Sequence, residues 1–290
     1  MLQILANGII TGGIIAVMAL AFTVVYLPTR IFYIALGGVY AIVPFLAWTG
    51  LQWGWAWYVA VAFALVIGVM LSLGCELLNH AWLEEKNASS GTHLVSSLGI
   101  YIIVVQAIAI IWGNETKVLR QGVDGVFNLA GVTLTQAQVG GAAIALLTIG
   151  SFYLWLQSTK LGLEFRALAD NKNELALRGF SIQKLRLVAF GIAGLLSSIA
   201  ALLVSWDVGF DPQGGLAALL LAVVASIIGG SQSFFGAVLG GILLGILRSQ
   251  VVWFLSAQWS EAASFAILAL FLVLRPQGLL GQKLRLESES

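Results

Sequence analysis

Charged residues are scarce in this sequence of 290 amino acids. Only 9% are Asp, Glu, Lys or Arg, whereas 60% are hydrophobic and the mean hydropathy is +0.98. Soluble domains carry about 25% charged residues, because their surface must be hydrated. The formal net charge of +1 offers no basic surface for nucleic acid. The composition therefore excludes a soluble globular protein and predicts a chain that crosses a membrane many times.

Residues that carry chemistry are also few. The single cysteine, Cys75, excludes an intrachain disulfide and any multi-cysteine metal site. The glycine-rich stretch GGSQSFFGAVLGG lacks the lysine of a phosphate-binding loop. We expect Glu76 to be interfacial at the edge of a span, and His80 and His93 to be solvated in or beside a cytoplasmic loop. Without a nucleophile–base pair, the sequence predicts a protein that is not an enzyme, with no metal or cofactor of its own.

Long apolar runs fill almost the whole chain. A spanning helix needs about 20 mainly apolar residues, and no strand-length stretch alternates with period two. The N-terminus lacks the basic region of a signal peptide, so we expect the first run to be retained. These features predict an all-α fold, a polytopic transmembrane helical bundle of about 8–9 spans in one domain over residues 1–290. The predicted spans outside 216–248 are 5–27, 31–49, 55–78, 94–113, 138–157, 186–206 and 262–275.

The stretch 216–248 needs separate treatment. It is apolar up to Arg248, yet its 33 residues would be about 50 Å long as one helix, against a hydrocarbon core of about 30 Å. The sequence GGSQSFFG interrupts it. We therefore predict two glycine-broken segments, 216–229 and 234–248, and keep one long kinked helix as the alternative.

The distribution of Lys and Arg orients these spans. The connection 158–186 carries six basic residues, whereas 114–137 carries two. Because basic residues accumulate in cytoplasmic loops, we place 158–186 in the cytoplasm and 114–137 outside. Counting spans then puts the N-terminus outside and the tail after Arg275 inside. Tryptophans, which favour the membrane interface, fall at the predicted external ends: Trp48, Trp53, Trp55, Trp57, Trp112, Trp206, Trp253 and Trp259.

The cytoplasmic connection contains a short predicted helix, NKNELALRG. Asn171 suits the N-cap, Glu174 has the spacing of a capping box, and Gly179 suits the residue after the helix. An isolated helix below about 12 residues is marginal in water, so this one is expected to dock. It either lies against the spans of its own chain or is gripped by a cytoplasmic subunit.

Three stretches give the chain a resemblance to a known family. The segment LGLEFRALADNKNELALRGFSIQKLRLVAFGIAGLLSSIAALL resembles the cytoplasmic loop and following span of branched-chain amino-acid ABC importer permeases. The stretches IIGGSQSFFGAVLGGILLGILRS and LVLRPQGLLG resemble two further family motifs. The residues that match the loop motif are Gly162, Arg166, Ala167, Asn171, Ala176 and Gly179, with Phe180 in place of the usual isoleucine.

The resemblance implies a set of partners in the bacterial inner membrane. These are a second homologous permease, two cytoplasmic ATPase subunits that hold ATP, a periplasmic solute-binding protein and membrane lipid, but no nucleic acid. The expected substrate is a branched-chain amino acid or a related small solute, because urea and short-amide permeases share the pattern. A stand-alone secondary transporter or channel is the alternative, although coupling-ion groups are sparse in the spans. The residues expected to couple the permease to its ATPases are Arg166, Asn171, Glu174, Arg178 and Gly179.

One short stretch departs from the family. Such permeases usually carry Asn-Phe-Ala-His-Gly-Glu between the first two spans, whereas this chain has YIALGG, so that Tyr33, Leu36 and Gly38 replace three polar residues. Tyr33 and Tyr40 are seven positions apart, which would place them on one helical face. We therefore predict a substrate pathway lined by Tyr33, Gly37 and Tyr40, with Gly229 and Gly230 opposite.

Overall fold

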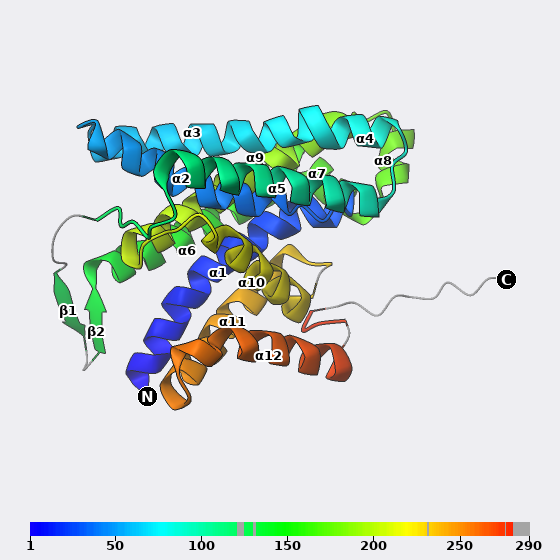
Figure 1. The fold of residues 1–290 in the computed structure, drawn as a ribbon. Helices are drawn as coiled ribbons and strands as arrows, with labels where there is room; N and C mark the ends of the chain where they lie inside the picture. The colour runs from blue at the N-terminus through cyan, green and yellow to red at the C-terminus, as the bar shows by residue number, and fades with distance from the viewer. Residues whose placement is uncertain (121–124, 130–131, 231, 276, 281–290) are drawn as a thin grey trace.

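The computed structural model describes residues 1–120, 125–129, 132–230, 232–275 and 277–280. Almost all of them are helical (Figure 1). The α-helices are α1 (Leu2–Thr29), α2 (Ala35–Gln52), α3 (Trp57–Cys75), α4 (Ala81–Glu85), α5 (Ser90–Trp112), α6 (Gln136–Ser158), α7 (Lys160–Asp170), α8 (Lys172–Leu177), α9 (Ile182–Asp207), α10 (Gly214–Gly229), α11 (Phe234–Phe254) and α12 (Ser260–Leu274). A π-helix, η1 (Glu76–His80), joins α3 to α4, a 3-10 turn, η2 (Ala257–Trp259), precedes α12, and β1 (Val126–Leu129) pairs antiparallel with β2 (Val132–Thr135).

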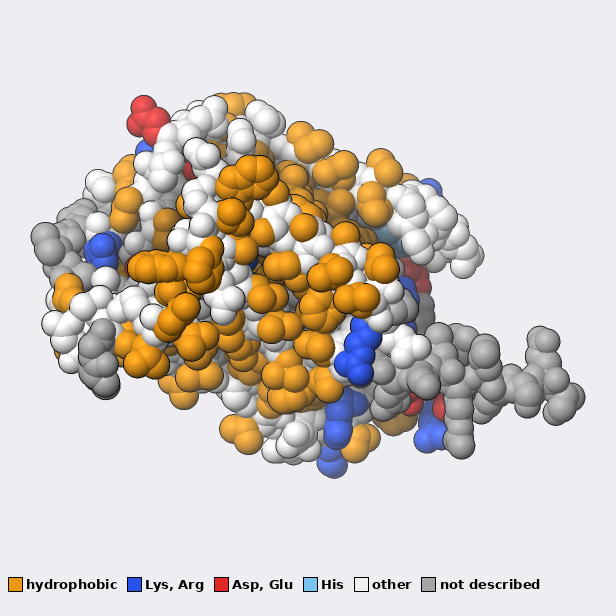
Figure 2. Space-filling view, turned by 90° about the horizontal axis from the view of Figure 1, so that it is seen from below, with side chains coloured by type: hydrophobic (Ala, Val, Ile, Leu, Met, Phe, Trp, Pro, Cys, Tyr) orange, Lys and Arg blue, Asp and Glu red, His pale blue; other side chains and the backbone are white. Residues whose placement is uncertain are grey.

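The described residues contain eight helical segments long and apolar enough to cross a membrane, and α10 is a shorter apolar helix. The all-α bundle of about 8–9 spans is thus confirmed, and the chain is a multi-pass membrane protein. Hydrophobic side chains cover much of the face shown in Figure 2. A surface of this kind is suited to lipid or to another subunit.

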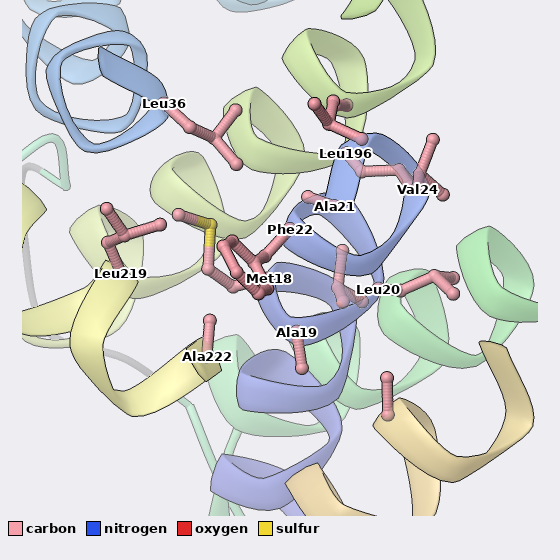
Figure 3. Packing of buried hydrophobic residues seen from close by; sticks show 14 of the residues in the cluster. Met18, Ala19, Leu20, Ala21, Phe22, Val24, Leu36, Leu196, Leu219 and Ala222 are labelled. Carbon is pink, nitrogen blue, oxygen red and sulfur yellow. The ribbon is translucent and has the colours of Figure 1, made fainter. Parts of the chain in front are cut away.

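Helix α1 lies at the centre of the bundle. Residues 16–25 are all buried, and a helix that is apolar on every side belongs in a core. Side chains of this stretch face Leu36 of α2, Leu196 of α9 and Leu219 of α10 (Figure 3). Close approach to α11 depends on glycine, because a Cβ on Gly12 would lie 2.8 Å from the backbone of α11. Small residues allow helix backbones to meet in this way.

The apolar stretch 216–248 is broken as predicted. Helix α10 ends at Gly229, Gly230 follows with a φ of 111°, and α11 begins at Phe234. The Ser233 hydroxyl caps α11 by accepting from the Gly236 amide at 3.2 Å. The alternative of one long kinked helix is therefore wrong, because the φ of Gly230 cannot continue a right-handed helix.

One end of the bundle collects the connections predicted to be external. The β1–β2 hairpin lies at the left of Figure 1, far from α4 and α8 at the right. In this region Lys117 bridges to Phe210, and Gln3 Nε2 donates to the Thr133 carbonyl at 2.8 Å. The N-terminus and two connections assigned to the outside thus lie together.

The opposite end collects segments predicted to be cytoplasmic. The Leu279 amide donates to the Ile228 carbonyl at 2.9 Å, so the C-terminal segment lies beside the end of α10. Phe165 of α7 stacks on Phe234 at the start of α11, with ring centroids 5.8 Å apart. These contacts agree with the predicted alternation of the chain. The assignment of this end to the cytoplasm rests on the basic residues.

The connection predicted over 79–93 is much shorter in the structure. Helix α3 continues through η1 and α4 to Glu85, and α5 begins at Ser90. The short polar stretch therefore covers only 86–89. His80 and His93 lie in helices, which corrects the expectation that they belong to a solvated loop.

Candidate functional site

The five residues predicted to line a pathway do not surround one space. Tyr33 precedes α2 and is fully buried, so it does not share a helical face with Tyr40, and that part of the prediction is wrong. Its hydroxyl donates to Ser72 Oγ at 3.3 Å, and its ring lies 4.8 Å from that of Phe190. Ser72 Oγ in turn donates to the Phe190 carbonyl at 2.7 Å. Tyr33 therefore joins the start of α2 to α3 and α9.

The glycines of the predicted pathway lie where backbones meet. A Cβ on Gly37 would lie 2.9 Å from the carbonyl oxygen of Gly215 in α10. Gly229 contacts the backbone of Gly236, and Gly230 contacts that of Gly278. A larger side chain at these positions would collide with a neighbouring backbone, so close packing of the chain accounts for glycine there. Their part in a pathway stays a prediction.

A buried ionic cluster is formed by side chains of η1, of α4, which lies at the right of Figure 1, and of the start of α9. Arg186, at the start of α9, is only 4% exposed. Its Nε donates to Glu76 Oε1 at 2.6 Å and its Nη2 to Glu76 Oε2 at 3.2 Å, while Nη1 lies 2.8 Å from Glu84 Oε2. A two-pronged pair of this kind matches the guanidinium fork to a carboxylate. Glu76 is 2% exposed and the helical segment continues to Glu85, so Glu76 does not lie at the edge of the span as predicted.

The two histidines extend this cluster. Their Nδ1 atoms are 3.1 Å apart, their rings stack, and His93 Nε2 lies 3.9 Å from Glu84 Oε2. His80 is fully buried and His93 is 3% exposed, which corrects the prediction that both are solvated. Four-residue spacing places Glu76, His80 and Glu84 on one helix face. This spacing was the sequence signal for the cluster. Among the described residues, no group of three His, Cys, Asp or Glu side chains is arranged to hold a metal ion.

The segment expected to couple to ATPases has two faces. The Glu174 amide donates to Asn171 Oδ1 at 3.2 Å, and Gly179 follows α8 with a φ of 83°, so the predicted cap and stop are confirmed. Leu175 is buried against Leu168 of α7 and Leu185 of α9. The opposite face is open, with Leu177 89% exposed.

The remaining predicted coupling residues are Arg166, in α7, and Arg178, directly after α8. Arg166 and Arg178 are both exposed, as are Glu174 and the neighbouring Phe180, which was not among the predicted coupling residues. Both interpretations of this helix are thus compatible with its position. One side of α8 packs against α7 and α9 of the same chain. The other side is exposed in the described part of the structure, so a partner could bind there.

Two cavities lie between the helices on either side of α10. The first, of about 400 Å³, lies between α5, α10 and α12. The second, of about 270 Å³, is bounded by α1, α2, α9, α10, α11 and α12. Tyr40 lines the second cavity, as do Arg248 and Glu261. Sequence reasoning named Tyr40 but missed the two charged residues, although Arg248 is a lone charge within a long apolar run.

Comparisons with known proteins place the chain in a family. Residues 4–274 match the model described as the branched-chain amino acid transport system / permease component. The chain belongs to this family. It is 27% identical to the high-affinity branched-chain amino acid transport system permease protein BraD of Pseudomonas aeruginosa, covering 97% of this chain and 96% of that protein.

A second relative shows that substrates vary among similar chains. The autoinducer 2 import system permease protein LsrC of Escherichia coli is 27% identical over 91% of this chain and 76% of its own length. The solved structure of PsaBC from Streptococcus pneumoniae in complex with Fab matches with a TM-score of 0.50 at 12% identity, over 93% of this chain and 90% of that one. This structure supports the fold alone. The relatives are transport permeases, and the chain's role is that of a permease.

Two sets of charged groups lie within the helical bundle of this permease. The Glu76–Arg186–Glu84 cluster joins η1, α4 and the start of α9. Tyr40, Arg248 and Glu261 line the second cavity, with Glu261 in the first turn of α12.

Proposed function

We propose that this chain is the membrane-spanning permease subunit of an ABC importer in the bacterial inner membrane. It passes a branched-chain amino acid or a related small solute from a periplasmic binding protein to the cytoplasm. A homologous second permease completes the pathway, and two cytoplasmic subunits hydrolyse ATP. The family match over residues 4–274 and the full-length similarity to BraD support this function.

The observation that carries the proposal is the connection from α8 to the spans. The exposed Leu177 and Phe180 offer apolar contacts to a partner, and Arg178 offers a cation beside them. Apolar anchors surrounded by charged groups are typical of docking surfaces.

A short path leads from this docking face into the bundle. Arg186 follows Phe180 by six positions and sits in the first turns of α9. Its bonds to Glu76 and Glu84 tie α9 to the far end of the α3–α4 segment. A displacement of α8 therefore moves α9 and α3 together rather than separately. Two helices that move as a unit provide the rigid element that alternating access requires.

The test uses the complete transporter, in which this permease is assembled with two ATPase subunits, a second permease and a solute-binding protein from the same source organism. Gly179→Pro should abolish ATP hydrolysis stimulated by the loaded binding protein, because proline cannot adopt a φ of 83°. Arg178→Glu should do the same by opposing the partner's charge. Both variants should still insert and copurify as full-length permease.

A matched pair separates docking from general damage. Leu177→Ala is expected to lower coupled hydrolysis by about tenfold, the effect of losing an apolar anchor. Leu78→Ala, at an equally exposed residue of η1 at the same end, should leave it unchanged. Normal coupled hydrolysis in all three variants, Leu177→Ala, Arg178→Glu and Gly179→Pro, would contradict the proposed function.

A further inference from the structure

The cavity bounded by six helices has an apolar lining with charges at separate points. Ile14, Ile15, Met18 and Leu221 supply apolar surface, and Tyr40 supplies a hydroxyl. The larger cavity beyond α10 shares Ala217, Leu221 and Glu261 with it. Ligand sites in proteins are mostly apolar with a few placed polar groups. This cavity has that composition.

Arg248 lies inside a membrane-spanning helix. It is six residues before the end of α11, about 9 Å along the helix axis. A charged side chain in a span is costly and needs a compensating group. Arg248 has only long contacts of 3.4 Å to the hydroxyls of Ser260 and Ser264. In the described part of the chain it has no carboxylate within 4 Å.

Glu261 supplies the opposite charge at the same cavity. It lies in the first turn of α12, is exposed, and acts electrostatically on Arg248 without forming an ion pair. The cavity therefore presents a cation and an anion that are separated rather than neutralised. The nearby N-terminus of α10 is already capped, because Asp211 Oδ1 accepts from the amides of Gln213 and Gly214 at 2.9 Å. An anionic group entering the cavity thus meets Arg248.

We propose that this cavity binds the zwitterion of an α-amino acid with an apolar side chain. The carboxylate pairs with Arg248, the ammonium group pairs with Glu261, and the side chain packs against Ile14, Met18 and Leu221. The proposal rests on the proposed function and names the substrate class within it. It favours amino acids over urea and short amides, because a neutral solute leaves both charges unpaired.

A purely structural role for Arg248 makes a different prediction. Arg248 would then hold α12 to α11 through Ser260 and Ser264, and removal of those hydroxyls would mimic loss of the guanidinium. The double variant Ser260→Ala/Ser264→Ala keeps the charge and deletes these contacts. Arg248→Met deletes the charge and keeps most of the apolar stem. The pair separates binding from helix attachment.

The experiment measures protection of a cysteine placed in the cavity of the assembled transporter. Thr11→Cys is introduced after Cys75→Ser removes the natural thiol, and Gln52→Cys, outside the cavity, is the control. L-Leucine should slow maleimide labelling of Thr11→Cys but not of Gln52→Cys. Two analogues, 4-methylpentanoate without the ammonium group and 3-methylbutylamine without the carboxylate, should protect about tenfold less well. Urea should not protect.

The variants then assign the charges. Arg248→Met and Glu261→Gln should each raise the leucine concentration needed for protection by about tenfold or more, whereas Ser260→Ala/Ser264→Ala should not. Three results would overturn the site: protection that survives Arg248→Met, equal protection by urea, or no labelling of Thr11→Cys with or without ATP.

ATP-driven leucine uptake, measured with the assembled transporter in lipid vesicles, separates this proposal from the proposed function. ATP-driven leucine uptake that survives Arg248→Met but is lost in Gly179→Pro would overturn the site and leave the proposed function intact. ATP-driven uptake of urea or a short amide but of no amino acid would also overturn the site alone, whereas absence of ATP-driven uptake of all these solutes by the unmodified transporter would count against the proposed function itself.

Discussion

Arg186 and Arg248 are two arginines within apolar helices that have opposite surroundings. Arg186 is 4% exposed and is matched by the carboxylates of Glu76 and Glu84 at 2.6 to 3.2 Å. Arg248 lines a cavity and reaches only two hydroxyls at 3.4 Å. The guanidinium of Arg186 is paired with carboxylates of its own chain. The guanidinium of Arg248 has N–H donors that remain available to a solute in the cavity.

The difference shows how one residue type serves two tasks in a membrane. A buried cation that is fully paired fixes the positions of the helices that supply its partners, and removing one member leaves the other charge buried. A cation beside a cavity can be compensated in part by water or by a solute. We therefore expect stability to depend on the Arg186 cluster and transport to depend on the Arg248 cavity.

The largest effect is expected from Arg186→Met. This change leaves Glu76 buried without its main cation and should lower stability by about 3–5 kcal/mol. The melting temperature of the detergent-solubilised permease measures the loss. Lys184→Met, an exposed position in the same turn of α9, is the matched control. Adding Glu76→Gln to Arg186→Met should recover part of the loss, because the buried carboxylate charge is then removed.

A contrast between two tyrosines sharpens the comparison. Tyr33 is fully buried beside the ionic cluster, so Tyr33→Ala should cost about 3–5 kcal/mol by leaving a cavity. Tyr40 already faces a cavity, so Tyr40→Ala should cost about 1 kcal/mol. Thermal melting tests both variants, and leucine uptake should be lost at Tyr40→Ala without loss of folded protein. Equal melting of the two variants would contradict the distinction.

Arg248→Met is expected to change stability little. The two long hydroxyl contacts that it deletes should contribute under about 1 kcal/mol, whereas leucine uptake should fall by about tenfold or more. Melting and uptake are measured on the same preparation. A drop in melting temperature as large as that of Arg186→Met would show that both arginines are structural.

The smallest effect is expected from cysteines that report on sidedness. Leu177→Cys and Val208→Cys replace exposed side chains, 89% and 75% accessible, so neither should alter stability. An impermeant maleimide should label Leu177→Cys only from the cytoplasm and Val208→Cys only from outside. Labelling of both from the same side would break the assignment of the two ends on which the comparison depends.

Several features could be predicted because their causes are local. The Asn171 cap and the Gly179 stop follow from residues within a few positions of each other, and the structure confirms them. The break at Gly229–Gly230 follows from length, because an apolar run too long for the membrane must end or bend. The loop predicted over 79–93 was wrong because the local sequence does not show what these residues pack against. Polar residues there resembled a solvated connection, although they sit within helices.

The sequence by itself determined a polytopic α-helical membrane protein, the approximate positions of its spans, and the alternation of its connections. Lipid imposes these features on any segment that is apolar for about 20 residues, whatever its neighbours are. Only the tertiary structure decided that Glu76 meets Arg186 across 110 positions, that Tyr33 is packed while Tyr40 faces a cavity, and that Arg248 and Glu261 share that cavity. These outcomes depend on which helix faces lie together, and helix packing is set by contacts between residues far apart in the chain.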